Sequence, residues 1–294
     1  MIKRIAVAFI LSFSGLPASS AQAHPFYVPN SKVVPLHSRT NGHDYVLYVS
    51  LPRDYANHPH KRYPVIYTLD ADYAFPIVAA VTTHFGDRHD MPPVIVVSIA
   101  YPGGISDYDA YHRNRTRDYT PTHTLKGGYG PKIQELSGGG PAFRRFITHE
   151  LFGYVELHWR ADPDNRTFVG HSYGGLFGSY VMFTKPEAFR NYVLVSPSLW
   201  YDEKVAFRFE ADYAKSHNDL PARVYFVIGS YENQPEHGRA MIDDARELLR
   251  RLRSRHYKHF EGVVRVLDRD THNSVFPAGV TRGLRVVLPN TSDR

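Results

Sequence analysis

Cysteine is absent from all 294 residues of the chain. This absence excludes a disulfide framework, a thiolate nucleophile and any metal site built on cysteine. The H-E-x-x-H pattern of zinc proteases is also missing, although the chain has 17 histidines. Pairs such as His58 and His60 flank a proline in a predicted surface loop, so we interpret the histidines as solvated and expect no metal site.

Blocks of like charge are missing as well. Lysine and arginine number 35 against 29 acidic residues, which gives a formal net charge of +6 spread along the chain. Such a modest excess slightly favours an anionic small-molecule substrate and gives no indication of nucleic-acid binding.

Long apolar runs are lacking too, because no segment reaches the roughly 18 residues that a transmembrane helix needs. The apolar run over residues 5–16 is shorter, follows Lys3 and Arg4, and precedes the small residues Ala21–Ala23. This order is typical of a secretory signal peptide. We therefore predict cleavage of residues 1–23 and export of the mature chain to a bacterial periplasm or beyond, without stable insertion into the membrane.

Residues 24–294 are predicted to form a single α/β domain. Short β-rich runs alternate there with helical patterns, which predicts a mainly parallel central sheet with helices on both faces. Apolar residues at helical spacing indicate two helices, over residues 140–159 and 239–256. Strands are expected over residues 44–52, 63–70, 92–101, 166–171, 190–198, 222–230 and 262–268.

The glycine-rich stretch VGHSYGGLFG carries the first candidate for chemistry. Glycine costs about 1 kcal/mol relative to alanine inside a helix, so four glycines here indicate a strained turn or close backbone packing. Gly170, Ser172 and Gly174 form the G-x-S-x-G pattern of a nucleophile elbow, which needs a strand before the serine and a helix after it. Both are predicted here, so we expect Ser172 to be a nucleophile; an ordinary glycine-rich turn is the alternative.

A serine nucleophile needs a histidine base, and the base needs an orienting carboxylate. In α/β-hydrolases the acid and then the histidine follow the serine along the chain. Among the histidines after Ser172, only His272 lies in a loop directly after a late predicted strand, and Glu232 follows an earlier one. We predict that Ser172, His272 and Glu232 are catalytic. The alternative acids are Asp202, Asp268 and Asp270.

An oxyanion hole requires two backbone N–H groups, one of them from the residue after the nucleophile. That residue is Tyr173. The second group should come from the turn after the strand at residues 63–70, where we predict the amide of Asp72, with Ala71 as the alternative.

Five stretches together resemble one known family: VIYTLDADYAF, VIVVSIAYPGG, RNRTRDYTP, GHSYGGLFGSYVMFTKPEAFRNYVLVSPSLWYD and DTHNSVFP. They look like the putative esterase (esterase D-like) family of α/β-hydrolases, and most like its branch of trilactone siderophore esterases. The resemblance extends from about Val46 to Val287. It implies an α/β-hydrolase fold, serine esterase activity on a small-molecule ester, and no metal or organic cofactor. It also implies that the turn at Leu69 and Asp70 leads to an oxyanion amide at Asp72.

Residues 102–141 form a long stretch without a clear period, rich in glycine, tyrosine and arginine. A loop of that length is usually functional or disordered, and we expect this one to fold over the site. Because arginine binds planar anionic groups by bidentate hydrogen bonds and stacking, Arg113 and Arg115 are predicted to bind substrate. The alternative is that the arginines brace the loop, as an Arg117–Asp118 pair would.

Trp200 and Tyr201 follow the predicted strand at residues 190–198 and should line an acyl or aryl pocket at the same rim. The leading hypothesis is an exported serine esterase acting on siderophore-type trilactones or other aryl-bearing esters. A carbohydrate-linked feruloyl or acetyl esterase is the alternative within the enzyme class. A non-catalytic hydrolase-fold binding protein is the rival from a different class, although such proteins usually lose the nucleophile or the base.

Overall fold

The computed structural model describes residues 27–234 and 239–290, and the predicted signal peptide at residues 1–23 lies outside them. The strands are β1 (Ser31–His37), β2 (Asp44–Ser50), β3 (Tyr63–Thr68), β4 (Ile95–Ala100), β5 (Ala161–His171), β6 (Asn191–Val195), β7 (Arg223–Gly229), β8 (Asn233–Gln234), β9 (Arg239–Ala240) and β10 (Glu261–Leu267). The helices are α1 (Ala71–Asp87), α2 (Tyr108–Tyr119), α3 (Pro131–Gln134), α4 (Gly140–Phe146), α5 (Phe152–His158), α6 (Tyr173–Thr184), α7 (Tyr201–Ser216), α8 (Met241–Ser254) and α9 (Val275–Val287).

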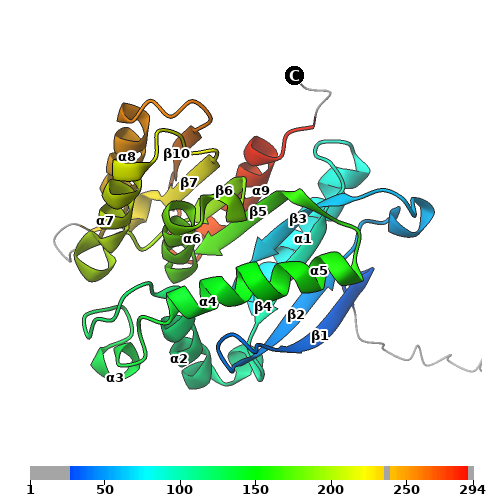
Figure 1. The fold of residues 1–294 in the computed structure, drawn as a ribbon, viewed down its shortest axis with the longest axis horizontal. Coiled ribbons are helices and arrows are strands. Elements are labelled where there is room, and N and C mark those ends of the chain that lie inside the picture. The colour runs from blue at the N-terminus through cyan, green and yellow to red at the C-terminus, as the bar shows by residue number, and fades with distance from the viewer. Residues whose placement is uncertain (1–26, 235–238, 291–294) are drawn as a thin grey trace, which may run out of the picture.

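Eight of these strands form one central sheet in the order β1-β2-β4-β3-β5-β6-β7-β10 (Figure 1). β1 pairs antiparallel with β2, and β2 pairs antiparallel with β4. The other neighbours are parallel, so β3, β5, β6, β7 and β10 all end at the same edge of the sheet. The mainly parallel sheet that the sequence predicts is confirmed.

Each of the seven predicted strands is present, as β2 to β7 and β10. Apolar runs such as β3 and β4 are almost entirely buried, as expected for strands covered on both faces. The sequence does not predict β1, because this edge strand is exposed or partly buried along its length and shows no regular alternation.

Helices cover both faces of the sheet, as predicted. On one face α1 and α9 pack against side chains that include Val193 and Val227. On the other face α4, α5 and α6 pack against side chains that include Leu194 and Phe226. Neighbouring residues of β6 and β7 therefore enter different cores, which follows from the two-residue period of a strand.

The helix predicted over residues 140–159 is found as α4 and α5, joined by a π-helical turn at Ile147–Leu151. Figure 1 shows these segments as one continuous green helix. The helix predicted over residues 239–256 is α8. Residues 102–141 are not one long loop, because they contain α2 and α3. The sequence hides α2 because its buried residues include Arg115, Thr116 and Asp118, which break the apolar pattern of a buried helix face.

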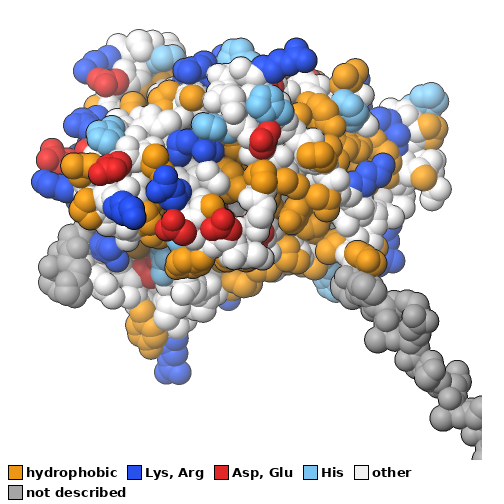
Figure 2. Space-filling model, turned by 90° about the horizontal axis from the view of Figure 1, so that it is seen from below, with side chains coloured by type: hydrophobic (Ala, Val, Ile, Leu, Met, Phe, Trp, Pro, Cys, Tyr) orange, Lys and Arg blue, Asp and Glu red, His pale blue; other side chains and the backbone are white. Residues whose placement is uncertain are grey.

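Acidic and basic side chains are interspersed on the face seen from below in Figure 2. Hydrophobic side chains gather mainly in the right half of that view. This mixture agrees with the even spread of charge along the sequence. In the part of the chain that the structure describes, no helix is long and apolar enough to cross a membrane.

Candidate active site

Ser172 lies at the turn between β5 and α6, so the strand and helix that its motif requires are both present. Its backbone angles, φ 58° and ψ −118°, are sparsely populated for residues other than glycine. Two main-chain hydrogen bonds hold them. The Ser172 N–H donates to the Val195 carbonyl (3.0 Å), and the Ser198 N–H donates to the Ser172 carbonyl (3.1 Å). The predicted strained turn is therefore found, and β6 supports it.

The glycines around Ser172 serve close packing. A Cβ on Gly170 would lie 2.4 Å from the Gly174 carbonyl oxygen, so only glycine fits there. A Cβ on Gly175 would lie 2.8 Å from Pro197 Cα, so this glycine lets α6 approach the end of β6. Close packing does not require glycine at Gly174, because a Cβ there would make contacts no closer than 3.4 Å.

His272 and Glu232 meet beside the Ser172 turn, each just past the end of its strand. Glu232 Oε2 lies 2.5 Å from His272 Nδ1. Glu232 Oε1 accepts hydrogen bonds from the Ser196 hydroxyl (2.6 Å) and the Gly229 N–H (2.7 Å). The Glu232 side chain is 3% exposed and that of His272 is 40% exposed. The carboxylate is thus fixed against Nδ1 of a partly open imidazole, which leaves Nε2 as the nitrogen that can accept a proton.

The alternative acids lie apart from His272. Asp268 is exposed and pairs with its neighbour in sequence. Asp270 accepts a hydrogen bond within its own loop (2.7 Å), and Asp202 accepts one from the Thr122 hydroxyl (2.6 Å). Among the described residues, Glu232 is the carboxylate bonded to the His272 ring.

Two cavities share Ser172, His272 and Tyr129 as lining residues. The Trp200 cavity has a volume of about 510 Å³. Its other lining residues are Gly128, Tyr173, Ser198, Trp200, Tyr231, Glu232, Gln234, Arg239, Met241 and Thr271. The Tyr108 cavity has a volume of about 420 Å³. Its other lining residues are Tyr73, Ile77, Ile105, Tyr108, Tyr111, His112, Arg115, His171, Asn273, Phe276 and Pro277.

The Ser172 hydroxyl and the His272 ring line the same two cavities. Within residues 27–234 and 239–290, no hydrogen bond joins the two side chains. Ser172 Oγ lies 3.4 Å from Ser198 Oγ. Catalytic hydrogen bonds in unliganded enzymes are often long and tighten when substrate binds. No group of three or more His, Cys, Asp or Glu side chains in these same residues is arranged to hold a metal ion.

Trp200 lies where the sequence predicts it, partly exposed in the Trp200 cavity. Tyr201 does not, because it is fully buried and lines neither cavity. Its hydroxyl donates to the Thr122 carbonyl (2.9 Å), and its ring packs against Tyr173 at 5.5 Å between centroids. Neighbouring residues at the start of α7 thus face opposite ways, one into the cavity and the other into the core.

Arg115, predicted to bind substrate, is instead part of a buried ion pair. Its Nε lies 2.6 Å from Asp70 Oδ1 and its Nη2 lies 3.0 Å from Asp70 Oδ2. The two side chains are 5% and 1% exposed. The Tyr111 hydroxyl donates to the same carboxylate (2.9 Å), and Arg115 Nη1 donates to the Tyr129 hydroxyl. The guanidinium is therefore neutralised, and it supports the wall of the Tyr108 cavity rather than offering a free charge to a ligand.

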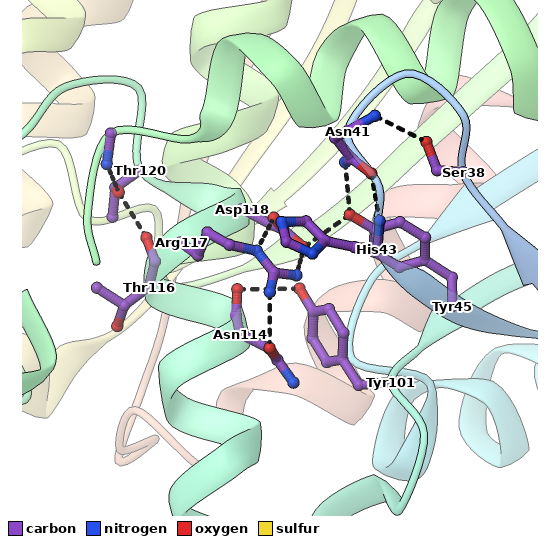
Figure 3. Close-up of polar contacts among 11 residues, drawn as sticks. Ser38, Asn41, His43, Tyr45, Tyr101, Asn114, Thr116, Arg117, Asp118 and Thr120 are labelled. Carbon is purple, nitrogen blue, oxygen red and sulfur yellow. Dashed lines mark hydrogen bonds and ion pairs between the residues drawn. The ribbon is translucent and has the colours of Figure 1, made fainter.

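Arg117 braces α2, which is the alternative interpretation of the arginines. Its Nε and Nη2 donate to the two Asp118 carboxylate oxygens (2.7 and 2.8 Å), and the Tyr45 hydroxyl donates to Asp118 Oδ2 (3.0 Å). Figure 3 shows the pair between α2 and the turn that holds Asn41 and His43. This contact ties α2 to the antiparallel edge of the sheet.

Arg113 lines neither cavity, so the structure does not support its predicted role in substrate binding. The α2 residues that line the Tyr108 cavity are Tyr108, Tyr111, His112 and Arg115. Their spacing of three or four residues defines one face of the helix. The rotation of about 100° per residue puts Arg113 on the other side of α2. The prediction treats a helix as a loop and so misses this division into faces.

Tyr173 and Asp72 belong to the first turns of α6 and α1. The first N–H groups of a helix have no carbonyl partner within the helix, and the helix dipole makes them attractive to an anion. These two turns lie at the same edge of the sheet, since β3 and β5 are parallel neighbours and the Leu69 N–H donates to the Val169 carbonyl (3.3 Å). The oxyanion role of both amides stays a prediction.

His171 is a residue of the site that the sequence analysis does not identify. Its Nε2 lies 2.8 Å from the His272 carbonyl oxygen, and its Nδ1 lies 3.0 Å from the Tyr73 hydroxyl. Burial, together with nearby His272 and Arg115, lowers the pKa of His171 well below its usual value. The ring is therefore neutral, with Nε2–H donating to the His272 main chain. Its place directly before Ser172 at the end of a buried strand is the signal that could have indicated it.

We expect this buried histidine to make the fold sensitive to acid. The unfolded chain binds a proton on His171 below a pH of about 6.5, whereas the folded chain does so only at a lower pH. The free energy of unfolding should therefore fall as pH drops below about 6.5, by up to about 1.4 kcal/mol per pH unit from this one group. Urea unfolding of the wild type and of His171→Gln, measured between pH 5 and 8, checks this. Parallel curves for the two proteins would contradict it.

Comparisons with known proteins give one consistent result. Residues 38–275 match the family model described as "Putative esterase". The chain is 30% identical to the ferri-bacillibactin esterase BesA of Bacillus subtilis, over 90% of this chain and 92% of that protein. It is 28% identical to a siderophore triacetylfusarinine C esterase of Aspergillus fumigatus, over 88% of this chain and 94% of that one.

Solved structures agree on the fold. The BES protein of Bacillus cereus has a TM-score of 0.77 at 27% identity, over 92% of this chain and 99% of that one. An IroE-like serine hydrolase of Shewanella oneidensis has a TM-score of 0.74 at 25% identity, over 87% of this chain and 79% of that one. The α/β-hydrolase fold expected from the sequence is confirmed.

Proposed function

The chain belongs to the "Putative esterase" family and is a carboxylic ester hydrolase, and from this premise we propose that it hydrolyses siderophore-type trilactones or other aryl-bearing esters through an acyl-enzyme on Ser172. The observation that carries the proposal is one arrangement. Ser172 lies in a strained turn and lines two cavities together with His272. The buried Glu232 carboxylate holds Nδ1 of that histidine.

The reaction follows from this geometry. Ser172 Oγ attacks the ester carbonyl carbon while His272 Nε2 takes the hydroxyl proton, and that proton then passes to the leaving alcohol as the ester C–O bond breaks. Water attacks the resulting acyl-enzyme with His272 again as base, which releases the acid and restores Ser172. The N–H groups of Tyr173 and Asp72 stabilise the negative charge on the carbonyl oxygen in both steps.

Glu232 fixes the tautomer that this sequence of steps needs. An acceptor 2.5 Å from Nδ1 keeps the proton on that nitrogen and leaves Nε2 unprotonated toward the cavities. The bonds from Ser196 and Gly229 keep the carboxylate in place. The carboxylate also stabilises the imidazolium that forms when His272 takes the serine proton.

The substrate class rests on the relatives and on the shape of the site. One relative is named a ferri-bacillibactin esterase and another a siderophore triacetylfusarinine C esterase, and Ser172 lines both cavities together with aromatic side chains. Pockets of about 300–1,000 Å³ suit drug-sized ligands. A cyclic substrate built from aryl-bearing ester units fits a site of two cavities better than a short acyl ester does.

We also propose that residues 1–23 direct export of the mature domain at residues 24–294, on the strength of their sequence pattern.

The proposal is tested by substrate comparison. The mature protein should show its highest kcat/KM on a ferric or iron-free trilactone siderophore, when compared with feruloyl sugars and 4-nitrophenyl acetate. The reason is that remote binding groups of the larger ester contribute to transition-state stabilisation. Faster turnover of a feruloyl sugar than of every trilactone would favour the carbohydrate-linked esterase instead.

A further inference from the structure

The Trp200 cavity contains a cation that the sequence analysis does not identify. Arg239 lies in β9, whose pairing with β8 places Arg239 opposite Gln234. Its guanidinium carbon lies 5.4 Å from the centroid of the Trp200 ring. Both side chains line the cavity that holds Ser172, and Arg239 is exposed while Trp200 is half-buried. A planar cation and a large ring thus form one surface next to the candidate nucleophile.

The charge of Arg239 has no counter-charge among the residues that the structure describes. Within residues 27–234 and 239–290 no carboxylate forms an ion pair with it, and the one acidic residue that lines the Trp200 cavity is Glu232. Both Glu232 oxygens are already bonded, to His272 on one side and to Ser196 and Gly229 on the other. As far as the described residues go, the larger cavity therefore carries a positive charge that is available to a ligand.

The Tyr108 cavity differs in this respect. Its arginine, Arg115, is bonded to both oxygens of Asp70 and has 5% of its side chain exposed. The rest of that cavity is largely aromatic and aliphatic, with Tyr108, Phe276 and Ile77 among its lining residues. The two cavities therefore offer a substrate different surfaces, one cationic and one without free charge.

The Trp200 ring is fixed by its neighbours. Its centroid lies 6.3 Å from that of Tyr173 and 6.4 Å from that of Tyr201, and both tyrosines are buried. Tyr173 is fixed in turn, since its hydroxyl accepts a hydrogen bond from the Gly128 N–H (2.8 Å). A ligand ring that packs against Trp200 therefore meets a surface that is already ordered, which lowers the entropic cost of binding.

We propose that Trp200 and Arg239 form a subsite for the anionic aryl group of the ester substrate, and that a neutral part of the substrate occupies the Tyr108 cavity. A guanidinium donates paired hydrogen bonds to a carboxylate or a catecholate, and the indole supplies a flat apolar surface to the ring that bears it. This assignment rests on the proposed function, because it requires that Ser172 be the group that attacks the ester. It places the selecting charge at Arg239 rather than at the α2 arginines.

The test uses a matched pair of substrates, 4-acetoxybenzoate and its neutral analogue 4-acetoxybenzamide. Arg239→Gln should raise KM for the benzoate by about 3- to 30-fold and change KM for the benzamide much less, with kcat little altered on both. Arg239→Glu should raise KM for the benzoate further. For Arg239→Lys, this KM should lie between those of the wild type and Arg239→Gln. In the wild type, 1 M NaCl should narrow the difference in KM between the two substrates, because the guanidinium is exposed.

Arg246→Gln is the matched control, since this exposed arginine lies on α8 outside both cavities. An equal shift in Arg246→Gln and Arg239→Gln, or a wild type that binds the two substrates equally, would overturn the subsite. So would an unchanged KM ratio in Arg239→Gln. If those results came with an inactive Ser172→Ala, the acyl-enzyme proposal would still stand. Full activity of Ser172→Ala on both substrates would instead overturn the proposed function itself.

Discussion

Replacing Ser172 with alanine should lower kcat/KM for 4-nitrophenyl acetate by about 10⁴- to 10⁶-fold. The substitution removes the attacking oxygen, and the remaining activity would come from substrate binding and the oxyanion donors alone. The fold should be unaffected, because alanine keeps the Cβ atom and the one polar contact of the hydroxyl within the described residues is long, at 3.4 Å to Ser198. Initial rates and urea unfolding of the same preparations measure the two effects separately.

Substitutions of the residues that act with Ser172 should lower activity by different amounts. His272→Ala should lower kcat/KM about as much as Ser172→Ala does. The double variant should have scarcely less activity than either single variant, because the residues act as a unit. Glu232→Gln should lower kcat/KM by a smaller factor, about 10²- to 10⁴-fold, since the carboxylate orients and stabilises the imidazole. Substantial turnover by a clean Ser172→Ala preparation would contradict the mechanism. A larger loss from Asp270→Asn than from Glu232→Gln would contradict the choice of acid.

The second large effect is on stability, and it concerns Arg115. Arg115→Met should lower the free energy of unfolding by about 3–5 kcal/mol, because it leaves the Asp70 carboxylate buried without its cation. Asp70 is the N-cap of α1 and has a φ of 57°, a conformation that asparagine tolerates better than most residues. Asp70→Asn is therefore a suitable second variant, and the double variant should lose less stability than the two single changes added together.

Arg250→Met provides the comparison for this pair. Arg250 pairs with Glu247 on the surface of α8, where the side chains are 68% and 36% exposed. Exposed pairs of this kind contribute about 0–1 kcal/mol, so its loss should be small. Urea unfolding at neutral pH measures the wild type and all four variants under the same conditions. Equal effects of Arg115→Met and Arg250→Met would show that the buried pair has no special importance for the fold.

The sequence predicts Ser172, Glu232 and His272 because their positions depend on local pattern. Each follows a strand that the sequence indicates by a run of apolar residues, and parallel strands bring their ends to one edge. The order of the motifs along the chain then assigns a role to each residue. These features need no knowledge of how distant segments pack.

The environment of the arginines could not be predicted in the same way. Arg115 finds its partner 45 residues away at Asp70, and its exposure depends on which face α2 turns to the sheet. Arg239 approaches Trp200 from a different strand end, and it belongs to none of the stretches that resemble the family. The composition of residues 102–141 suggested that arginines act near the site. Only the three-dimensional packing separates the neutralised Arg115 from Arg239, which has no ion-pair partner among the described residues.

The backbone of Ser172 shows what the protein gives up in stability at its proposed nucleophile. Angles of φ 58° and ψ −118° cost a side-chain-bearing residue about 1–3 kcal/mol, and glycine would adopt them with far less strain. A chain selected for stability alone would therefore be expected to lose this serine, and its inactive descendant would be the sturdier protein. A hydroxyl at a position that favours glycine is an example of the trade-off between stability and activity. Natural selection keeps such a residue when activity matters more than the stability that it costs.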